Sequence, residues 1–330
     1  MGKAVTFDTF GGPEVLRLHE VPEEQPASGE VLLRVRAIGL NRTEQTLRSG
    51  RSPQKPQLPS RIGFEAAGEI ELIGPAVEGF HVGDRVALVP TYGASQYGLY
   101  AEKSLAPARS LVKLAPDVSY EEAAATWVAF GTAWSGLVDA GKLTASQTVA
   151  VTAASSSVGL AAIQIAKSLG ARVIAITRTK DKSQALLDHG ADAVIVSQTQ
   201  EVDTELQRLT DGVGVDLALD AVGGGALPKL FKGTRNGGLV LLYGALETQP
   251  TFVPPFDIFG RGITLRGFAL PAIARDPEKL HALIRFIQSG IANGSLRPTI
   301  ARTFELSDII DAHRYMESGE QFGKIVVITG

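Results

Sequence analysis

One segment of the chain has the composition of a phosphate-binding loop, and it reads Ala153-Ala-Ser-Ser-Ser-Val-Gly159. An apolar run that predicts a strand, Val149 to Thr152, precedes it, and apolar residues at helical spacing follow. Small side chains let the backbone approach a pyrophosphate, and free N–H groups at the start of a helix attract the anion. On the pattern G-x-G-x-x-G, however, only Gly159 is a glycine, because Ala154 and Ser156 occupy the other two positions. An ordinary helix capped by serine is therefore the alternative.

The next predicted strand, Arg172 to Thr177, ends in a basic turn that bears on the choice of nucleotide. Arg178 follows Gly159 by nineteen residues, where a site for NAD usually has Asp or Glu to bind the ribose 2′-hydroxyl. Arg178 and Lys182 instead favour a 2′-phosphate, because cations form charge-assisted hydrogen bonds with it. A solvated turn that happens to be basic is the alternative. We expect NADPH, with the binding residues Ser155, Ser156, Ser157, Val158, Gly159, Thr177, Arg178 and Lys182.

Repeated strand and helix patterns surround these two loops. From about residue 125, apolar runs of strand length alternate with helical spacing, and glycines such as Gly170 and Gly190 end the helices. The expected strands are 149–152, 172–177, 193–196, 216–219 and 239–243, and the expected helices are 158–169, 181–188 and 202–209. This alternation predicts an α/β fold with a parallel, doubly wound sheet.

The rest of the chain follows other patterns. Short alternating runs before about residue 120, such as 31–37 and 86–89, come after turn signals and predict a mainly antiparallel β region. After a proline-rich loop at 249–256, we expect a strand at 263–267, helices at 277–289 and near 308–316, and a strand at 324–328. The expected domains are a dinucleotide-binding domain at 125–264 and a discontinuous domain formed by 1–124 and 265–330.

Composition excludes several classes of protein. The 330 residues carry 32 Lys and Arg against 35 Asp and Glu, a net charge of −3, so no basic excess favours nucleic acid. The chain has no cysteine, which removes disulfides, thiolate nucleophiles and cysteine-based metal sites. Charged residues interrupt the N-terminal region where a secretory signal would need an apolar run, and the uncharged stretch 143–166 is too polar for lipid. We expect a cytoplasmic protein that binds neither membranes nor nucleic acid.

Several segments in the same order resemble the medium-chain dehydrogenase/reductase superfamily, above all its zinc-free quinone oxidoreductase branch. They are Ala37-Ile-Gly-Leu-Asn41-Arg, Pro59-Ser-Arg-Ile-Gly-Phe-Glu65-Ala-Ala-Gly68, Val82-Gly-Asp-Arg-Val86, Gly131-Thr132-Ala-Trp, Ser157-Val-Gly-Leu-Ala-Ala-Ile-Gln-Ile-Ala-Lys167 and Phe322-Gly-Lys-Ile-Val-Val. The resemblance spans nearly the whole chain. It implies a Rossmann domain together with a mainly β, GroES-like catalytic domain.

The resemblance also bears on metal. Zinc alcohol dehydrogenases of this superfamily hold the ion with Cys, His and Cys, and the matching positions here are Asn41, Phe64 and Val128, with Glu65 kept beside them. A tetrahedral zinc needs three protein donors, and the side chains of Phe and Val provide none. The five histidines are not spaced as ligand pairs and are assigned to the surface or the core: His19, His81, His189, His281 and His313. We expect no metal site.

Reduction of a carbonyl without a Lewis acid requires a well-placed nicotinamide and hydrogen-bond donors for the developing oxyanion. By resemblance, Asn41 lies beside the nicotinamide ribose and the substrate, and Thr132 touches the nicotinamide. A satisfied turn and a helix cap are the respective alternatives. The resemblance also implies contacts with the nicotinamide half or, for the last residue, with the adenosine phosphate: Tyr243, Gly244, Phe268, Leu270 and Lys324.

The proton donor has two candidates. Related reductases often place a tyrosine in the loop after Asn41, but residues 48–55 contain none. Tyr92 and Tyr97 fall where the family lines its substrate cleft, so Tyr92 is the candidate donor and solvent is the alternative. Arg42 and Glu44 are candidates for shaping the cleft, although a surface ion pair explains them more simply.

Together these features predict a zinc-independent, NADPH-dependent oxidoreductase that reduces quinones or α,β-unsaturated carbonyl compounds. The alternatives are a metal-free alcohol or ketone dehydrogenase and a non-catalytic, NADPH-binding regulatory protein. A homodimer is expected, paired through the strand at 239–243 as an exposed sheet edge.

Overall fold

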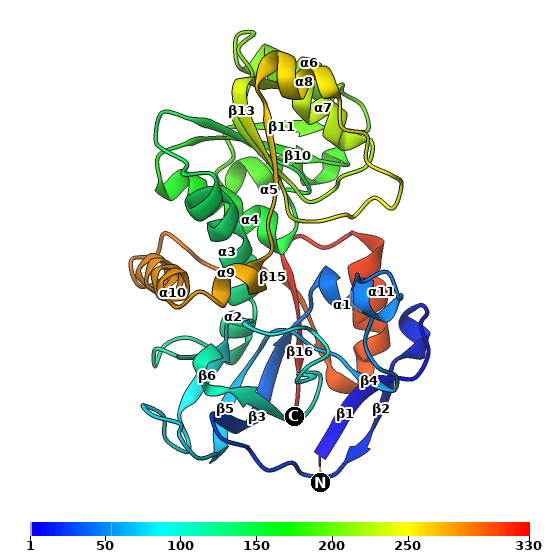
Figure 1. Ribbon diagram of the computed structural model, residues 1–330, viewed down its shortest axis with the longest axis vertical. Helices are drawn as coiled ribbons and strands as arrows, with labels where there is room; N and C mark the ends of the chain where they lie inside the picture. Colours follow the sequence, from blue (N-terminus) through cyan, green and yellow to red (C-terminus); the bar gives the residue numbers. More distant parts are fainter. Residues whose placement is uncertain (1, 54) are drawn as a thin grey trace. The chain divides into compact units, whose positions relative to one another are not determined.

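Figure 1 shows the computed structural model of the chain, which describes residues 2–53 and 55–330. The chain divides into two units. Unit 1 consists of the residues up to Val128 together with Ala274–Pro277 and Pro298–Gly330, and unit 2 consists of Ala129–Ile273 and Glu278–Arg297.

Unit 1 is mainly β structure. Its strands are β1 (Gly2–Phe7), β2 (Arg17–Val21), β3 (Glu30–Gly39), β4 (Ser60–Arg61), β5 (Ala66–Ile73), β6 (Arg85–Leu88), β7 (Lys103–Pro107), β8 (Leu111–Lys113), β15 (Ile300–Glu305) and β16 (Lys324–Ile328). A seven-stranded sheet has the order β15-β16-β3-β5-β6-β8, with β7 also paired to β3, and a three-stranded sheet has the order β2-β1-β4. All these pairs are antiparallel except β15 with β16.

Strand β3 lies at the centre of the larger sheet because it pairs with β5, β7 and β16. Its apolar residues, such as Val31, Leu33 and Val35, are buried. Arg34 and Arg36 alternate with them and form ion pairs with Glu71 and Glu69 of β5, at 3.3 and 3.5 Å. This period of two is the pattern that predicted a strand here.

The helices of unit 1 are short. They are η1 (Pro13–Val15), α1 (Arg42–Arg48), η2 (Ala108–Ser110), α2 (Tyr120–Ala124), η5 (Leu306–Asp308) and α11 (Ile309–Ser318), and α3 (Trp127–Trp134) starts at the end of this unit. Capping residues fix their ends. Ser119 Oγ accepts the Glu122 N–H at 3.1 Å at the start of α2, and Gly319 ends α11 with a φ of 72°.

Unit 2 contains the predicted parallel sheet. Its strands are β9 (Thr148–Val151), β10 (Arg172–Thr177), β11 (Ala193–Val196), β12 (Val215–Asp220), β13 (Thr234–Leu242) and β14 (Thr264–Gly267). Their order is β11-β10-β9-β12-β13-β14, and every pair is parallel. Because the chain order reverses beside β9, the sheet is doubly wound, as the alternation of strand and helix predicted.

Helices cover this sheet (Figure 1). They are η3 (Ser135–Ala140), α4 (Ser157–Ser168), η4 (Lys180–Lys182), α5 (Ser183–Asp188), α6 (Val202–Leu209), α7 (Ala226–Gly233), α8 (Pro255–Arg261), α9 (Leu270–Ala274) and α10 (Pro277–Ala292). One buried cluster joins the sheet to α6 and α7, and it includes Ile174, Ile195, Leu206 and Phe231. Burial of such apolar side chains is the main favourable contribution to the stability of this unit.

The division of the chain differs from the expected domains. Residues 265–273 and 278–297 belong to unit 2, although the sequence suggested that the whole tail joins the first region. Strand β14 pairs with β13, which extends the parallel sheet. Helix α10 buries Leu283, and Lys279 of the same helix donates to Asp139 at 2.9 Å. These contacts are long-range, so local sequence patterns do not reveal them.

The structure also corrects the expected sheet edge. Strand β13, which contains 239–242, has β14 on its outer side, so β14 rather than β13 is the edge strand. Helices α7 and α8 and strand β15 were not expected. The proline-rich loop ends earlier than predicted, because Pro255 occupies the first turn of α8, where proline is well tolerated. Among the described residues, the helices are too short or too polar to cross a bilayer.

Candidate functional site

The loop after β9 has the local structure that a phosphate-binding turn requires. Ser156 Oγ accepts the Gly159 N–H at 3.1 Å, which caps the start of α4. A Cβ on Gly159 would lie 2.5 Å from the Ala154 carbonyl oxygen, so only glycine fits there. The Ala154 N–H donates to Ile176 O at 3.1 Å, which ties the loop to the end of β10. The two alternatives for this loop, a serine cap and a phosphate-binding turn, therefore do not exclude each other.

The basic turn follows at that end of β10. Thr177 is buried, whereas Arg178 and Lys180 are exposed. The Thr179 hydroxyl lowers the pKa of Asp181, and the positive charges of Lys182 and Arg178 contribute to this shift. The turn therefore presents exposed cations beside the loop that Gly159 closes.

Two further strands end near residues that sequence reasoning assigned to the nicotinamide half. Tyr243 follows β13 and Phe268 follows β14, and their ring centroids lie 5.9 Å apart. A Cβ on Gly244 would lie 2.6 Å from the Ala221 carbonyl oxygen, which explains the glycine there. Leu270 is buried, and a Cβ on Gly131 would lie 3.1 Å from each of its methyl carbons. The structure therefore brings Tyr243 and Phe268 together and places Leu270 against α3.

Asp220 is a buried acidic residue at the end of a strand that sequence reasoning missed. It ends β12, is fully buried, and accepts from the Thr152 hydroxyl at 2.7 Å and from the N–H groups of Val222 and Gly223 at 2.9 and 3.0 Å. Burial, with the negative charge of Asp220, raises the pKa of Tyr243. An aspartate at the carboxyl end of an apolar strand was the available signal.

Thr132 lies inside α3 and is 9% exposed, so it does not cap the helix. Its helix continues into the π-helical turn η3, where the Ser135 hydroxyl donates to Gly131 O at 2.7 Å. Turns of this kind are rare and are often found at functional sites. The polar side chain of Thr132 thus precedes an irregularity in the helix.

Unit 1 carries a second group of polar residues, centred on Asn41 at the start of α1. Asn41 Nδ2 donates to Gly39 O at 2.9 Å, and Asn41 Oδ1 accepts from Lys324 Nζ at 2.6 Å. Lys324 Nζ also donates to Glu65 Oε2 at 2.5 Å. The other oxygen of Glu65 accepts the Val128 N–H at 2.7 Å. The side chains of Asn41, Lys324 and Glu65 are all buried, so these bonds are shielded from water.

The placement of Lys324 does not support its expected role. Its ammonium is 1% exposed and is occupied by Asn41 and Glu65 of unit 1. A buried ammonium keeps such partners because losing them would leave its charge uncompensated. Lys324 is therefore not assigned to an adenosine phosphate.

Glu44 is also placed differently from expectation, since it is fully buried rather than part of a surface ion pair. Its Oε2 accepts the Asn41 N–H, while Arg42 donates to Gln45 at 3.1 Å. Burial raises the pKa of Glu44 to about 8, although the nearby Lys324 ammonium opposes this rise. Burial likewise raises the pKa of Glu65, opposed by Lys324. Glu65 accepts three hydrogen bonds, so its ionised form is better stabilised than that of Glu44.

Tyr92 is buried beside this group. Its hydroxyl lies 3.5 Å from Phe64 O, and its ring meets those of Phe64 and Tyr97 edge to face. Burial, with the negative charge of Glu65, raises the pKa of Tyr92 well above its ordinary value. The phenol therefore holds its proton at neutral pH. Tyr97 is less buried and donates to Glu30 at 3.1 Å.

The positions that match zinc ligands offer few donors. The side chains of Phe64 and Val128 are apolar, and the carboxamide of Asn41 is already bonded to Gly39 and Lys324. Across 2–53 and 55–330, no three His, Cys, Asp or Glu residues gather as a metal-binding group. Gln54, in the loop without tyrosine, lies outside the described residues.

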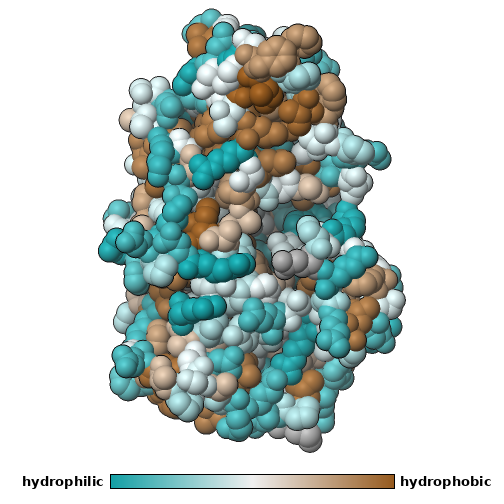
Figure 2. Space-filling model, in the orientation of Figure 1, coloured by the Kyte–Doolittle hydropathy of each residue, from teal (hydrophilic) through white to brown (hydrophobic). Residues whose placement is uncertain are grey.

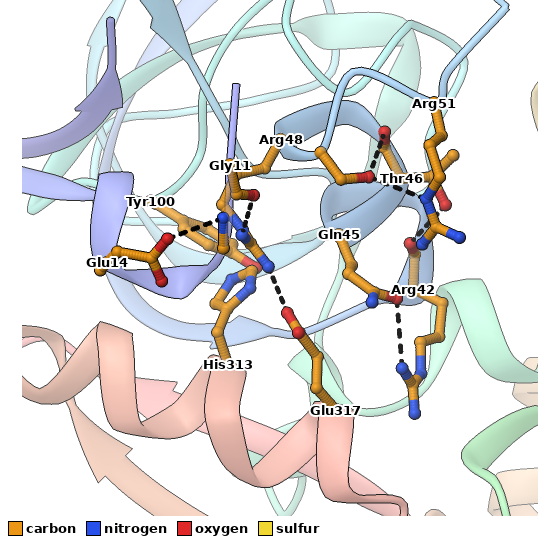
Figure 3. Close-up of polar contacts among 12 residues, drawn as sticks. Gly11, Glu14, Arg42, Gln45, Thr46, Arg48, Arg51, Tyr100, His313 and Glu317 are labelled. Carbon is orange, nitrogen blue, oxygen red and sulfur yellow. Dashed lines mark hydrogen bonds and ion pairs between the residues drawn. The ribbon is translucent and has the colours of Figure 1, made fainter. Parts of the chain in front are cut away.

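A second buried cluster, which includes Arg48 of α1, was not anticipated, and Figure 3 shows its residues. Arg48 of α1 is 1% exposed, donates to Gly11 O at 2.5 Å and forms an ion pair with Glu317. His313, from α11, is fully buried, and its Nε2 lies 3.2 Å from the Tyr100 hydroxyl. The sequence left open whether His313 lies at the surface or in the core, and the structure places it in the core. A histidine on the buried face of an amphipathic helix was the available signal.

Comparisons with known proteins agree with this architecture. Residues 27–117 match a family model described as the alcohol dehydrogenase GroES-like domain, and residues 157–289 match one described as zinc-binding dehydrogenase. The quinone oxidoreductase of Pseudomonas aeruginosa is 32% identical over 99% of this chain and 100% of its own length. These matches confirm the predicted combination of a Rossmann and a GroES-like domain.

Solved structures resemble the chain over the same extent. The structure described as Escherichia coli quinone oxidoreductase complexed with NADPH is 28% identical, with 99% of each chain covered and a TM-score of 0.93. A structure described as NAD-dependent alcohol dehydrogenase is 32% identical, with 99% of this chain and 100% of that chain covered and a TM-score of 0.91. The full-length relationship shows that the chain belongs to the medium-chain dehydrogenase/reductase superfamily, in its quinone oxidoreductase-like branch.

Proposed function

We propose that the chain is an NADPH-dependent oxidoreductase that reduces quinones or α,β-unsaturated carbonyl compounds by hydride transfer and needs no zinc. The observation that carries the proposal is the basic turn at the end of β10, tied to the glycine loop after β9. Arg178 and Lys182 lie in the turn where relatives that bind NAD have an acidic residue. The Escherichia coli relative, described as a complex with NADPH, supports the same choice of cofactor.

The chain offers residues that fit each part of this cofactor. The tight packing of Gly159 against Ala154 leaves the N–H groups at the start of α4 close to the loop, where a pyrophosphate binds favourably. Arg178 and Lys182 would hold the 2′-phosphate, next to Ser155, Ser156, Ser157, Val158 and Thr177. Asn41, Thr132, Tyr243, Gly244, Phe268 and Leu270 would line the nicotinamide half. NADPH supplies a hydride when it is bound.

The substrate side of the proposal rests on the residues of unit 1. Hydride addition leaves a developing oxyanion that must be stabilised and protonated. Asn41 is the polar residue that the chain keeps at the position of a zinc ligand, and Tyr92 is a buried phenol that retains its proton. Tyr92 is the proposed donor because it falls where the family lines its substrate cleft, not because of its raised pKa, which makes a phenol a weaker acid; solvent is the alternative. Zinc independence is proposed because Phe64 and Val128 lack donor side chains.

A second function has one observation in its favour. The structure described as an NAD-dependent alcohol dehydrogenase is as similar in sequence as the quinone oxidoreductase of Pseudomonas aeruginosa, since both are 32% identical. A metal-free alcohol or ketone dehydrogenase therefore stays the alternative. This alternative predicts activity with saturated ketones. A reductase that acts only on quinones or α,β-unsaturated carbonyl compounds would not reduce them.

Anaerobic stopped-flow measurements with NADPH separate the two functions. Rapid oxidation by 1,4-benzoquinone or methyl vinyl ketone, but not by cyclohexanone, is the expected result. Oxidation by cyclohexanone alone would establish the alternative, and tight NADPH binding without turnover across the panel would establish a regulatory protein. Metal analysis of the active protein is expected to find zinc far below one ion per chain, and loss of activity after chelation would contradict zinc independence.

A homodimer is part of the proposal, with a different surface from the one first expected. Strand β14 is the outer strand of the parallel sheet, and the preceding helix α8 exposes 75% of Phe256 and 70% of Phe259. Figure 2 shows apolar side chains gathered over this part of unit 2. Large exposed apolar side chains beside the edge strand of a sheet are typical of surfaces that associate. The cytoplasmic location also stays a proposal, which cell fractionation tests.

A further inference from the structure

Lys324 joins two side chains of unit 1 that lie far apart in the sequence, Asn41 and Glu65. Its ammonium is buried at the start of β16, and Glu65 at 2.5 Å compensates its charge. The same ammonium also donates to Asn41 Oδ1 at 2.6 Å, across 283 positions of the sequence. A buried charge is expensive unless it is paired, which accounts for Glu65, and the other N–H groups of the ammonium also need acceptors, one of which is Asn41 Oδ1.

That contact fixes the orientation of the Asn41 carboxamide. The oxygen faces the ammonium, and Nδ2 donates to Gly39 O at 2.9 Å and lies 3.4 Å from Glu65 Oε2. Rotation of the amide by 180° would place its NH₂ against the ammonium and its oxygen against a carbonyl. Both contacts would then be repulsive, because an ammonium has no acceptor and a carbonyl has no donor. Asn41 is therefore locked in one orientation.

The backbone at Gly39 packs closely against this pair and leaves no room for a side chain. A Cβ on Gly39 would lie 2.8 Å from Lys324 Cε, 2.8 Å from Glu65 Oε2 and 2.0 Å from the Ala124 carbonyl oxygen. The second oxygen of Glu65 holds the Val128 N–H in the first turn of α3. One ion pair thus fixes both the Asn41 side chain and the start of the helix that continues to Thr132.

We propose that Lys324 is a positioning residue for the reduction reaction: with Glu65, it holds the Asn41 carboxamide in the single orientation that the nicotinamide and substrate meet. This inference rests on the proposed function, in which Asn41 contacts those groups. Lys324 acts through Asn41 and does not itself touch the reacting atoms. A small misplacement of such a contact costs rate rather than binding, because hydride transfer depends on alignment.

Three variants of the full chain test this role. Lys324→Met removes the ammonium and leaves Glu65 unpaired, so it is expected to lower both stability and activity. The double variant Lys324→Met with Glu65→Gln removes both charges of this pair and keeps an acceptor for the Val128 N–H. Lys103→Met is the matched control, since Lys103 is an ion-paired lysine of the same unit that donates to Glu71 and Glu23 at 2.5 and 3.1 Å.

The double variant separates positioning from stability. We expect its urea midpoint to return close to that of the wild type, because neutral replacement of both partners avoids an unpaired charge. Its kcat with NADPH and 1,4-benzoquinone is expected to stay lowered by about 100-fold, with KM for NADPH little changed. Recovery of kcat together with the midpoint would overturn the positioning role, as would an equal loss of kcat in Lys103→Met.

A second measurement does not depend on turnover. The side-chain NH₂ signals of Asn41 are identified in ¹⁵N spectra by their loss in Asn41→Ala, and their hydrogen exchange is followed. Exchange is expected to be about tenfold faster or more in both Lys324 variants and unchanged in Lys103→Met, because a released amide reorients and meets solvent. Equal exchange in all proteins would overturn the inference. A wild type that binds NADPH but oxidises none would instead contradict the proposed function, while this measurement would still decide the role of Lys324.

Discussion

The Tyr100 hydroxyl lies 3.2 Å from Nε2 of His313, and both side chains are fully buried (Figure 3). Their rings meet edge to face, with centroids 5.7 Å apart. Burial raises the pKa of Tyr100 well above its ordinary value, and the nearby Glu44 carboxyl adds to this rise. The interior beside α1 therefore contains two titratable groups, His313 and Glu44, that are held in their neutral forms. Opposite dependences of stability on pH follow from them.

His313 is expected to weaken the protein at acid pH. Burial lowers its pKa to about 3, with contributions from the positive charges of Arg48 and Arg42. The unfolded chain binds this proton near pH 6.5, so the unfolded state holds more protons between pH 6.5 and 3. Stability is therefore lost as the pH falls through this window, by up to about 1.4 kcal/mol for each pH unit.

The His313→Gln variant tests this dependence through urea midpoints measured from pH 4 to 7. The difference between wild type and variant should change with pH, because glutamine does not titrate. His81→Gln serves as the control, since the His81 side chain is 82% exposed. Parallel curves for wild type and His313→Gln would contradict the prediction.

Glu44 is expected to act in the opposite direction. Its pKa is raised to about 8, above the value near 4.5 of an unperturbed glutamate, so the folded state holds the extra proton in between. Stability contributed by this proton is present at low pH and is lost as the pH rises through about 8. Between pH 7 and 8.5, His313 is neutral in both states and does not interfere.

The Glu44→Gln variant isolates this effect because its amide keeps an oxygen for the Asn41 N–H. The thermal unfolding midpoint of the wild type should fall between pH 7 and pH 8.5. The midpoint of Glu44→Gln should change less over the same range. Glu102→Gln provides the comparison, because the Glu102 carboxyl of unit 1 is only partly buried and accepts the Lys3 N–H. An equal fall in wild type and Glu44→Gln would show that Glu44 is already ionised at pH 7.

Sequence reasoning succeeded where the signal is local. The loop ending at Gly159 and the strand ending at Thr177 are each contained in a few residues, and both appear in the structure where the pattern placed them. The contact between Lys324 and Asn41 spans 283 positions, so no local pattern predicts it. Glu44 resembles a surface residue in sequence because it follows Arg42 at a helix start. Only the packing of α1 against Tyr100 reveals its burial.

The absence of a local signal also explains why the sequence did not show which unit the C-terminal elements join. Apolar spacing correctly predicted a helix at α10, but not which unit it joins, because that depends on contacts such as Lys279 with Asp139. Likewise, the pattern of β13 predicted a strand and could not indicate that β14 lies outside it. Element type follows from local sequence, whereas neighbours follow from tertiary packing.

Arg178→Ala is expected to change the preference between the two nicotinamide cofactors. The guanidinium would bond to the 2′-phosphate that only NADPH carries, and such charged hydrogen bonds are worth about 1.5–3 kcal/mol, or roughly 10- to 150-fold in affinity. The ratio of Kd values for NADPH and NADH, measured by fluorescence titration, should therefore rise by this factor. Arg172→Ala, at the other end of β10, is the matched control. An unchanged ratio in Arg178→Ala would refute the assignment of NADPH.

Gly159→Ala is expected to disrupt the phosphate-binding loop. The new Cβ would lie 2.5 and 2.6 Å from the carbonyl oxygens of Ala154 and Ala153, so the turn must open. Overpacking of this kind costs about 1–3 kcal/mol, and NADPH affinity should fall by a comparable amount. Gly260→Ala, at a helical glycine where a Cβ would meet no atom within 4 Å, should leave the affinity unchanged. Equal affinities for both variants would show that the loop does not contact the cofactor.

Replacement of the exposed phenylalanines of α8 is expected to dissociate the proposed homodimer. Phe256 and Phe259 pack together with centroids 5.1 Å apart and are largely exposed, so a second copy would bury both. Light scattering should give the wild type twice the chain mass of 34.8 kDa and give the double variant Phe256→Glu with Phe259→Glu the single mass. Val82→Glu, at an apolar position of unit 1 that is 64% exposed, should remain a dimer. A dimeric double variant would place the interface elsewhere, because two introduced charges are not tolerated in a buried apolar contact.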